Sequence, residues 1–92
     1  MDGKVVIVTG SASGIGRAAA TLFVREGAKV VIADSNEEAA RETAATLGPN
    51  ARALRTDVSK DADVRALVAF TLDQFGRIDV LVNNAGFGFT GT

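Results

Sequence analysis

The strongest constraint on the fold is the alternation of two hydrophobic periods along the chain. The β-branched runs over 4–9 and 29–33 lack polar alternation and are typical of strands buried on both faces. Between such runs, apolar residues recur at helical spacing. Strands that alternate with helices of this length predict a parallel sheet with helices on both faces.

Each helical segment has recognisable signals of its own. Gly27, Gly48-Pro49 and Gly76 are expected to end the three helices, and Ser35 with Glu38 is expected to form a capping box at the second. The residues at helical spacing are Ile15, Ala19, Leu22 and Phe23, then Ala40, Thr43, Ala44 and Leu47, then Val64, Leu67, Val68, Leu72 and Phe75. Further strands are expected over 51–56 and 78–82, which makes 1–92 a single α/β domain.

Composition argues against several function classes. The chain is 47% hydrophobic and 23% charged, with a formal net charge of −1. Because no basic face is available to neutralise phosphates, we expect no binding to nucleic acid or to an anionic membrane. Cysteine and histidine are absent, so we expect no metal site. The apolar run over 5–8 is too short for a membrane or signal segment, and a cytoplasmic location is expected.

A glycine-rich loop joins the first strand to the first helix. Gly10 lets the chain leave the strand through backbone angles that are costly for other residues. Gly14 removes a side chain where a pyrophosphate would approach, and Gly16 allows close packing of helix against strand. The helix N-terminus would present N–H groups and a positive dipole end to the phosphates, with hydroxyl donors from Ser11 and Ser13. A tight turn without any ligand explains the same glycines, and G-x-x-x-G-x-G departs from the ordinary dinucleotide fingerprint.

Two motifs follow the first and fourth expected strands. They are Thr9-Gly10-x-x-x-Gly14-Ile15-Gly16 and Asn83-Asn84-Ala85-Gly86. Together they resemble the short-chain dehydrogenase/reductase family, over essentially the whole chain. The resemblance implies a Rossmann-type three-layer sandwich with strand order 3-2-1-4, incomplete relative to the family fold. It assigns the first motif, Ile15 included, to the cofactor pyrophosphate, and it assigns Asn84, Ala85 and Gly86 to sheet support and the ribose on the nicotinamide side. From the residues alone, the second motif is also explained as a polar turn.

Asp34 stands at the end of the second strand, eighteen positions after Gly16. An isolated aspartate there is explained as an acid at a helix start. Its strand position and its distance from the loop favour a carboxylate that accepts hydrogen bonds from the adenosine ribose. It would repel a 2′-phosphate. Ser13, Ser35 and Asn36 are not basic, whereas family members that prefer NADP carry Arg or Lys nearby, so the resemblance implies NAD rather than NADP.

Asp57 and Val58 follow the third strand. The resemblance implies that the Asp57 carboxylate accepts from the adenine amino group and that Val58 contacts the ring through its backbone. A plain acid at the N-terminus of a helix is the competing explanation for Asp57. These two residues complete the expected cofactor contacts.

Catalytic residues are not expected in this chain. The family's hydride transfer between nicotinamide and an alcohol or carbonyl uses a tyrosine, a lysine four residues later and a serine, which the resemblance places beyond residue 92. The chain has no tyrosine. We therefore expect the NAD(H)-binding part of an oxidoreductase acting on CH–OH groups, inactive by itself. A stand-alone dinucleotide-binding module and a structural or interaction domain are the alternatives.

The last expected strand has a consequence for association. Within 78–82, Asp79 is the only charged residue. With no further strand beside it, this strand would form an exposed edge that invites pairing with another chain. We expect self-association or a homo-oligomer through that edge.

Overall fold

Seven elements alternate along the chain in this computed structural model, which describes residues 2–12 and 14–84. The strands are β1 (Val5–Thr9), β2 (Lys29–Asp34), β3 (Ala51–Arg55) and β4 (Val80–Asn83). The helices are α1 (Gly14–Arg25), α2 (Glu37–Leu47) and α3 (Asp61–Phe75). The predicted strand–helix alternation is confirmed. The last strand begins at Val80 rather than at residue 78.

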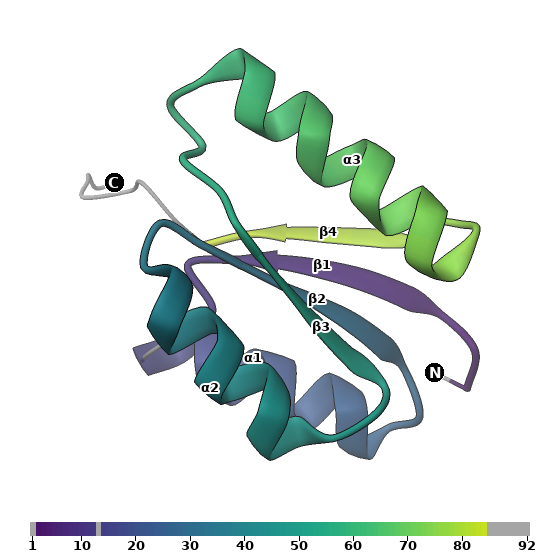
Figure 1. The fold of residues 1–92 in the computed structure, drawn as a ribbon. Coiled ribbons are helices and arrows are strands. Elements are labelled where there is room, and N and C mark those ends of the chain that lie inside the picture. Colours follow the sequence, from purple (N-terminus) through teal and green to yellow (C-terminus); the bar gives the residue numbers. More distant parts are fainter. Residues whose placement is uncertain (1, 13, 85–92) are drawn as a thin grey trace.

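The four strands form one parallel sheet in the order β3-β2-β1-β4. In its centre Ile7 of β1 pairs with Val31 of β2 on one side and with Leu81 of β4 on the other. Helices α1 and α2 lie on one face of the sheet and α3 lies on the other (Figure 1). The expected three-layer Rossmann-type arrangement and strand order are therefore confirmed.

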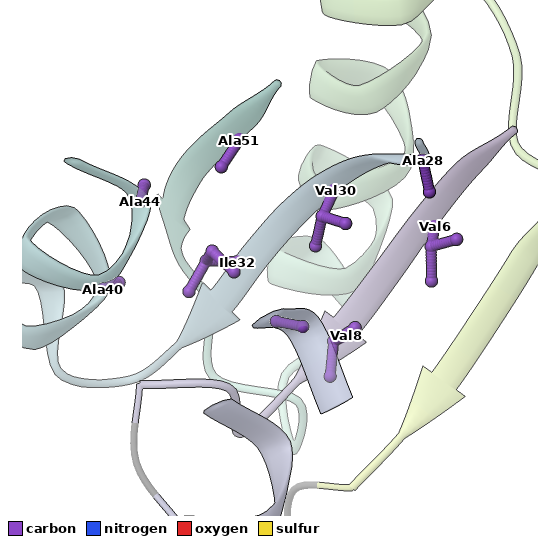
Figure 2. Close-up of a cluster of buried hydrophobic side chains, with 9 residues drawn as sticks. Val6, Val8, Ala28, Val30, Ile32, Ala40, Ala44 and Ala51 are labelled. Atoms are coloured by element: carbon purple, nitrogen blue, oxygen red, sulfur yellow. The ribbon is translucent and has the colours of Figure 1, made fainter. Parts of the chain in front are cut away.

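The core on the α1–α2 face combines branched strand residues with alanines. Val6, Val8, Val30 and Ile32 are fully buried and share this face, because alternate residues of a strand point to the same side. Small alanine side chains let the helices approach the sheet closely (Figure 2). The alanines of this cluster are Ala20, Ala28, Ala40, Ala44 and Ala51.

Helix α3 covers the opposite face less completely. Ile7, Val31 and Ala33 pack there against Leu67, which is 2% exposed. Two residues expected on the same side of the helix, Val68 and Leu72, are 40% and 47% exposed. Helical spacing thus located α3 but not the extent of its buried face.

In helix α1 the buried face also differs from the predicted one, and by more than in α3. Its buried residues are Gly16 and Ala20, whereas Ile15 is 80% exposed and Leu22 is 57% exposed. Almost every position of α1 is apolar or small, so several stripes satisfy helical spacing. The side of α1 that packs on the sheet combines the small residues Gly16 and Ala20 with the partly buried Phe23 and Val24.

Helix α2 has the predicted buried face but not the predicted cap. Its buried residues are Ala40, Thr43 and Ala44. The expected capping box of Ser35 and Glu38 is wrong: the N-cap is Asn36, whose side-chain oxygen accepts the Ala39 N–H at 3.1 Å. The helix starts here because the Asp34 carboxylate accepts the Asn36 N–H at 3.0 Å and closes a tight turn just before it.

Candidate functional site

The candidate site lies at the carboxyl ends of the strands, around the end of β1. From β1 the chain continues through α1 to β2, which lies beside β1 on one side, whereas β4 lies beside β1 on the other. This reversal of direction opens a crevice at the strand ends in parallel α/β sheets. Three segments meet there: the glycine loop, the end of β2 and the end of β4 (Figure 1).

At Gly10 the glycine loop has a backbone conformation that favours glycine, as the sequence predicts. Gly10 has φ +62° and donates its N–H to the Ala33 carbonyl at 2.8 Å, which fixes the turn out of β1. Gly14 has φ +60°, and a Cβ added there would meet no atom of the described residues within 4 Å. The first residue of α1 therefore borders open space, which leaves room for a ligand to approach the backbone.

Gly16 is required by close packing rather than by its backbone angles. A Cβ at this buried position would collide with the Gly10 carbonyl oxygen and lie 2.8 Å from the Asn84 side-chain nitrogen. The start of α1 thus rests directly on the loop and on the end of β4. The sequence predicts close packing against a strand, and the structure adds the loop carbonyl and the Asn84 amide.

Thr9 and Asn84 fasten the end of β4 to the glycine loop. The Asn84 backbone N–H donates to the Thr9 hydroxyl at 2.9 Å, and the Asn84 side-chain amide donates to the Gly10 carbonyl at 3.3 Å. The Thr9 hydroxyl in turn donates to the Asn83 side-chain oxygen at 3.0 Å. Asn84 is therefore part of the same cluster as the loop. The other predicted residues of that motif, Ala85 and Gly86, lie outside the described residues, as does Ser13.

The N-terminus of α1 differs from those of the other two helices in charge. Helix α2 carries Glu37 and Glu38 in its first turn, and α3 carries Asp61 and Asp63, whereas α1 has no acid there. Acids in a first turn offset the positive end of the helix dipole. In α1 that positive end is not offset within the first turn, and the described residues leave open space beside its first residue, Gly14.

Ser11 uses its hydroxyl inside the loop. The side chain is fully buried, and its hydroxyl donates to the Val8 carbonyl oxygen at 2.6 Å. A hydroxyl has a single proton to donate, so in this structure the Ser11 donor is engaged in holding the turn.

Asp34 bridges the end of β2 and the glycine loop. One carboxylate oxygen accepts the Ala12 N–H at 3.1 Å and the other accepts the Asn36 N–H at 3.0 Å. The contact with Ala12 joins residues far apart in the sequence, so no local sequence signal points to it. Each oxygen has a second lone pair available for another donor.

Asp57 is held within its own turn. Its carboxylate accepts from both the hydroxyl and the N–H of Ser59, at 2.6 and 3.0 Å. These hydrogen bonds, with smaller contributions from Lys60 and Arg55, lower the pKa of the Asp57 carboxyl below its usual value. The side chain is therefore ionised at neutral pH, and within the described part of the chain its carboxylate is hydrogen-bonded to Ser59 rather than to the glycine loop.

Val58, beside Asp57, borders a mostly apolar cavity of about 170 Å³. This cavity lies between α3 and the strands β1 and β4. Its lining residues are Ile7, Thr9, Val58, Val64, Leu67, Val68, Ile78, Leu81 and Asn83. The structure thus brings together the glycine loop, Asp34 and Asn84, and places Asp57 and Val58 at a neighbouring strand end.

The described ranges contain neither a metal-binding cluster nor a membrane-spanning helix. Within 2–12 and 14–84, no group of three or more Asp or Glu side chains is arranged to hold a metal ion. In the same ranges, no helix has the length and apolar character needed to cross a bilayer.

Comparisons with known proteins give one consistent result. A family model described as short chain dehydrogenase matches residues 4–92. A sorbitol dehydrogenase from Cereibacter sphaeroides is 58% identical over 85 residues, which are 92% of this chain and 33% of that protein. A tropinone reductase-like protein from Erythroxylum coca is 49% identical over 86 residues, 94% of this chain and 32% of that protein. The chain spans about one third of the length of these relatives.

Solved structures agree with the sequence relatives. A 3-ketoacyl-(acyl-carrier-protein) reductase from Brucella melitensis, complexed with NADH, superposes with a TM-score of 0.86 at 44% identity, over 87% of this chain and 33% of that chain. A hydroxysteroid dehydrogenase from Escherichia coli superposes with a TM-score of 0.89 at 40% identity, over 92% of this chain and 37% of that chain. The match of the family model over almost the whole chain, together with the glycine loop and strand order described above, shows that the chain belongs to the short-chain dehydrogenase family.

Proposed function

We propose that this chain binds NAD(H) as the cofactor-binding part of an oxidoreductase that acts on CH–OH groups. The observation that carries the proposal is the N-terminus of α1, where open space beside Gly14 meets a positive helix end that no first-turn acid offsets. Such a terminus stabilises a bound pyrophosphate through its backbone N–H groups and its dipole. The NADH complex of the Brucella melitensis reductase supports the same assignment.

We propose that the dinucleotide lies across the strand ends and meets the predicted contact residues. Pyrophosphate would lie on the loop of Gly10, Ser11, Ser13, Gly14, Ile15 and Gly16. Asp34 would take the adenosine ribose, Asp57 and Val58 the adenine, and Asn84, Ala85 and Gly86 the ribose on the nicotinamide side. When bound, the nicotinamide supplies hydride donation or acceptance. The chain's own residues bind and orient it.

Asp34 supports a preference for NAD over NADP. Its carboxylate places a negative charge at the end of β2, where a 2′-phosphate would be repelled. It also engages the Ala12 N–H, so this backbone donor is not available to a phosphate oxygen. Both effects act against NADP, and the remaining lone pairs of the carboxylate suit the two hydroxyls of an unphosphorylated ribose.

The proton chemistry of the proposed reaction would come from elsewhere in a longer protein. This chain has neither tyrosine nor histidine, and its roles are therefore binding and orientation. The relatives named as a sorbitol dehydrogenase and a tropinone reductase-like protein support an alcohol or ketone as substrate. A stand-alone dinucleotide-binding module is the second candidate, supported by the self-contained cluster of loop, Asp34 and Asn84. We place the protein in the cytoplasm.

A charge placed at the α1 N-terminus tests the proposal. Ile15 is 80% exposed, so Ile15→Asp should fold, and a first-turn acid favours the helix itself. The same charge repels a pyrophosphate. We expect the Kd for NADH, measured by nicotinamide fluorescence, to rise by at least about tenfold while the free energy of unfolding stays equal or increases.

Two variants separate charge from other effects. Ile15→Asn removes the same side chain without adding charge and should weaken binding less than Ile15→Asp. Leu22→Asp adds the same charge on the same helix at a position that is 57% exposed, and it should leave the Kd within about twofold of the wild-type value. If the wild-type chain shows no affinity for NADH, or if Leu22→Asp is as harmful as Ile15→Asp, the proposal fails.

The proposed partner besides the cofactor is a second copy of the chain. In the described sheet β4 is an edge strand whose sequence carries no charge. The opposite edge, β3, contains Arg52 and Arg55. Charged residues protect an edge strand against pairing, so self-association would use β4.

A further inference from the structure

Thr43 differs from the other threonines in the described helices in what its hydroxyl contacts. Thr21, Thr46 and Thr71 each donate to the carbonyl four residues earlier in their own helix, at 2.8, 3.0 and 2.8 Å. This is the usual bond of a helical threonine. The Thr43 hydroxyl instead donates out of α2, to the Ala12 carbonyl of the glycine loop, at 3.4 Å.

The partner of Thr43 is a residue held from two sides. Ala12 is 7% exposed. Its N–H donates to the Asp34 carboxylate at 3.1 Å, and its carbonyl accepts from Thr43 at 3.4 Å. The donor and the acceptor of a single residue are thus bound by two different elements, β2 and α2. Two residues later the chain reaches Gly14 and the open N-terminus of α1.

We propose that Thr43 is a positioning residue of the cofactor site, which fixes the glycine loop through the Ala12 carbonyl. The inference rests on the proposed function, since it assigns Thr43 a role in NAD(H) binding that no direct contact provides. A loop that is already held in its binding shape loses less conformational freedom when the ligand binds. Thr43 and Asp34 supply that constraint from opposite ends of the Ala12 residue.

The alternative is that Thr43 merely fills space between α2 and the loop. Its side chain is 1% exposed, so the methyl group contributes packing whatever the hydroxyl does. The two groups can be separated by substitution. Thr43→Val keeps the shape and removes the hydroxyl, whereas Thr43→Ser keeps the hydroxyl and removes the methyl. Thr71→Val is the matched control, because Thr71 is also fully buried but lies in α3 on the other face of the sheet.

The first measurement needs no ligand. In the free chain, NMR gives the exchange rate of the Ala12 amide proton and the chemical shift of the Ala12 carbonyl carbon. For Thr43→Val we expect exchange about two- to tenfold faster than in the wild type and a displaced carbonyl shift, as for loss of one neutral hydrogen bond. Thr43→Ser and Thr71→Val should keep both values close to wild type.

The second measurement is the Kd for NADH of the same variants. Thr43→Val should raise the Kd by about two- to tenfold. Thr43→Ser and Thr71→Val should each keep a Kd close to that of the wild type. If Thr43→Val does not fold, Thr43→Ala supplies a smaller variant without the hydroxyl.

Two results would overturn the inference: wild-type Ala12 signals in Thr43→Val or Thr43→Ala, or equal damage from Thr43→Ser and Thr43→Val, which would mean packing alone. If the wild type does not bind NADH, the proposed function fails. The ligand-free measurement still decides whether Thr43 holds the loop.

Discussion

Among single residues, Asp34 combines two tasks, since it holds Ala12 and carries the charge proposed to select the cofactor. Asp34→Asn removes the charge and leaves only one oxygen to accept the two backbone N–H groups. We expect the Kd for NADH to rise by about tenfold, as for loss of a charge-assisted hydrogen bond, and the Kd ratio of NADPH to NADH to fall. Titration of each variant with both cofactors gives the ratio.

Asp57→Asn is the control for this discrimination. Asp57 lies at a different strand end and is proposed to meet the adenine, which both cofactors share. Its substitution should change both Kd values by the same factor and leave their ratio constant. An unchanged ratio in Asp34→Asn would remove Asp34 as the selecting residue.

Asp79 gives a prediction for the pH dependence of stability. Hydrogen bonds from the Arg77 side chain and the Val5 backbone N–H, at 2.7 and 2.8 Å, lower the pKa of its carboxyl below the usual value of 3.8. The folded state therefore favours the ionised form. This stabilisation is complete above the unfolded pKa and is lost as the pH falls through the folded one.

Asp79→Asn removes this contribution. In urea unfolding, the variant should be less stable than the wild type at about pH 7, and the difference should shrink towards about pH 3. A difference that stays constant over this range would show that the Asp79 carboxyl contributes nothing that depends on its protonation.

The sequence revealed site residues only where a local pattern or spacing marks them. Gly10, Gly14 and Gly16 follow a motif, and Asp34 stands at a strand end at a suitable distance. The partners of these residues were not predictable, because Ala12 and Thr43 are brought to Asp34 and the loop by packing of elements distant in sequence. Thr43 was recognised only as part of a buried helix face.

At the scale of elements, the junction of α1 with the loop and β4 depends on the absence of one methyl group. Gly16→Ala would drive a Cβ into the Gly10 carbonyl and against the Asn84 amide. Overpacking of this kind costs about 1–3 kcal/mol. We expect a corresponding loss in the free energy of unfolding, measured in urea, together with weaker NADH binding, because the loop must move.

Ala18→Val is the matched control for added bulk, since Ala18 lies on the exposed side of the same helix. It should change the free energy of unfolding by about 0.5 kcal/mol or less. If Gly16→Ala is as mild as Ala18→Val, then α1 is free to shift away from the loop, and the close packing at Gly16 does not position the site.

The existence and order of the elements were predictable, but their buried faces were only partly so. Continuous β-branched runs are typical of buried strands in a parallel sheet, and the predicted strand ends lie within one or two residues of the observed ones. In α2, charged residues mark the outer face, and its buried face was predicted correctly. In α1 the outer face is apolar as well, with Ile15 and Leu22 exposed, so periodicity could not distinguish one stripe from another.

For the whole molecule, the two faces of the sheet are unequally covered. Two helices and a cluster of alanines close one face, whereas on the other face a single helix leaves Val68, Leu72 and Leu81 between 40% and 58% exposed. The cavity of about 170 Å³ between α3 and the strands lies on this second face. The uncharged strand β4 borders it and is an edge of the described sheet, so the apolar surface and the sheet edge lie together.

This combination makes association through β4 testable. Leu81 is 58% exposed on the edge strand, and Leu81→Lys adds a charge of the kind that discourages edge pairing. In sedimentation velocity over a concentration series, we expect the wild-type chain to associate and Leu81→Lys to remain largely monomeric.

Leu22→Lys makes the same substitution at an equally exposed position of α1 and should associate as the wild type does. The two variants have the same net charge, and each lacks one leucine. A difference in their association therefore shows where the contact surface lies and does not reflect general solubility. A wild-type chain that stays monomeric at every concentration would refute association. Association that Leu22→Lys weakens as much as Leu81→Lys would move the contact away from β4.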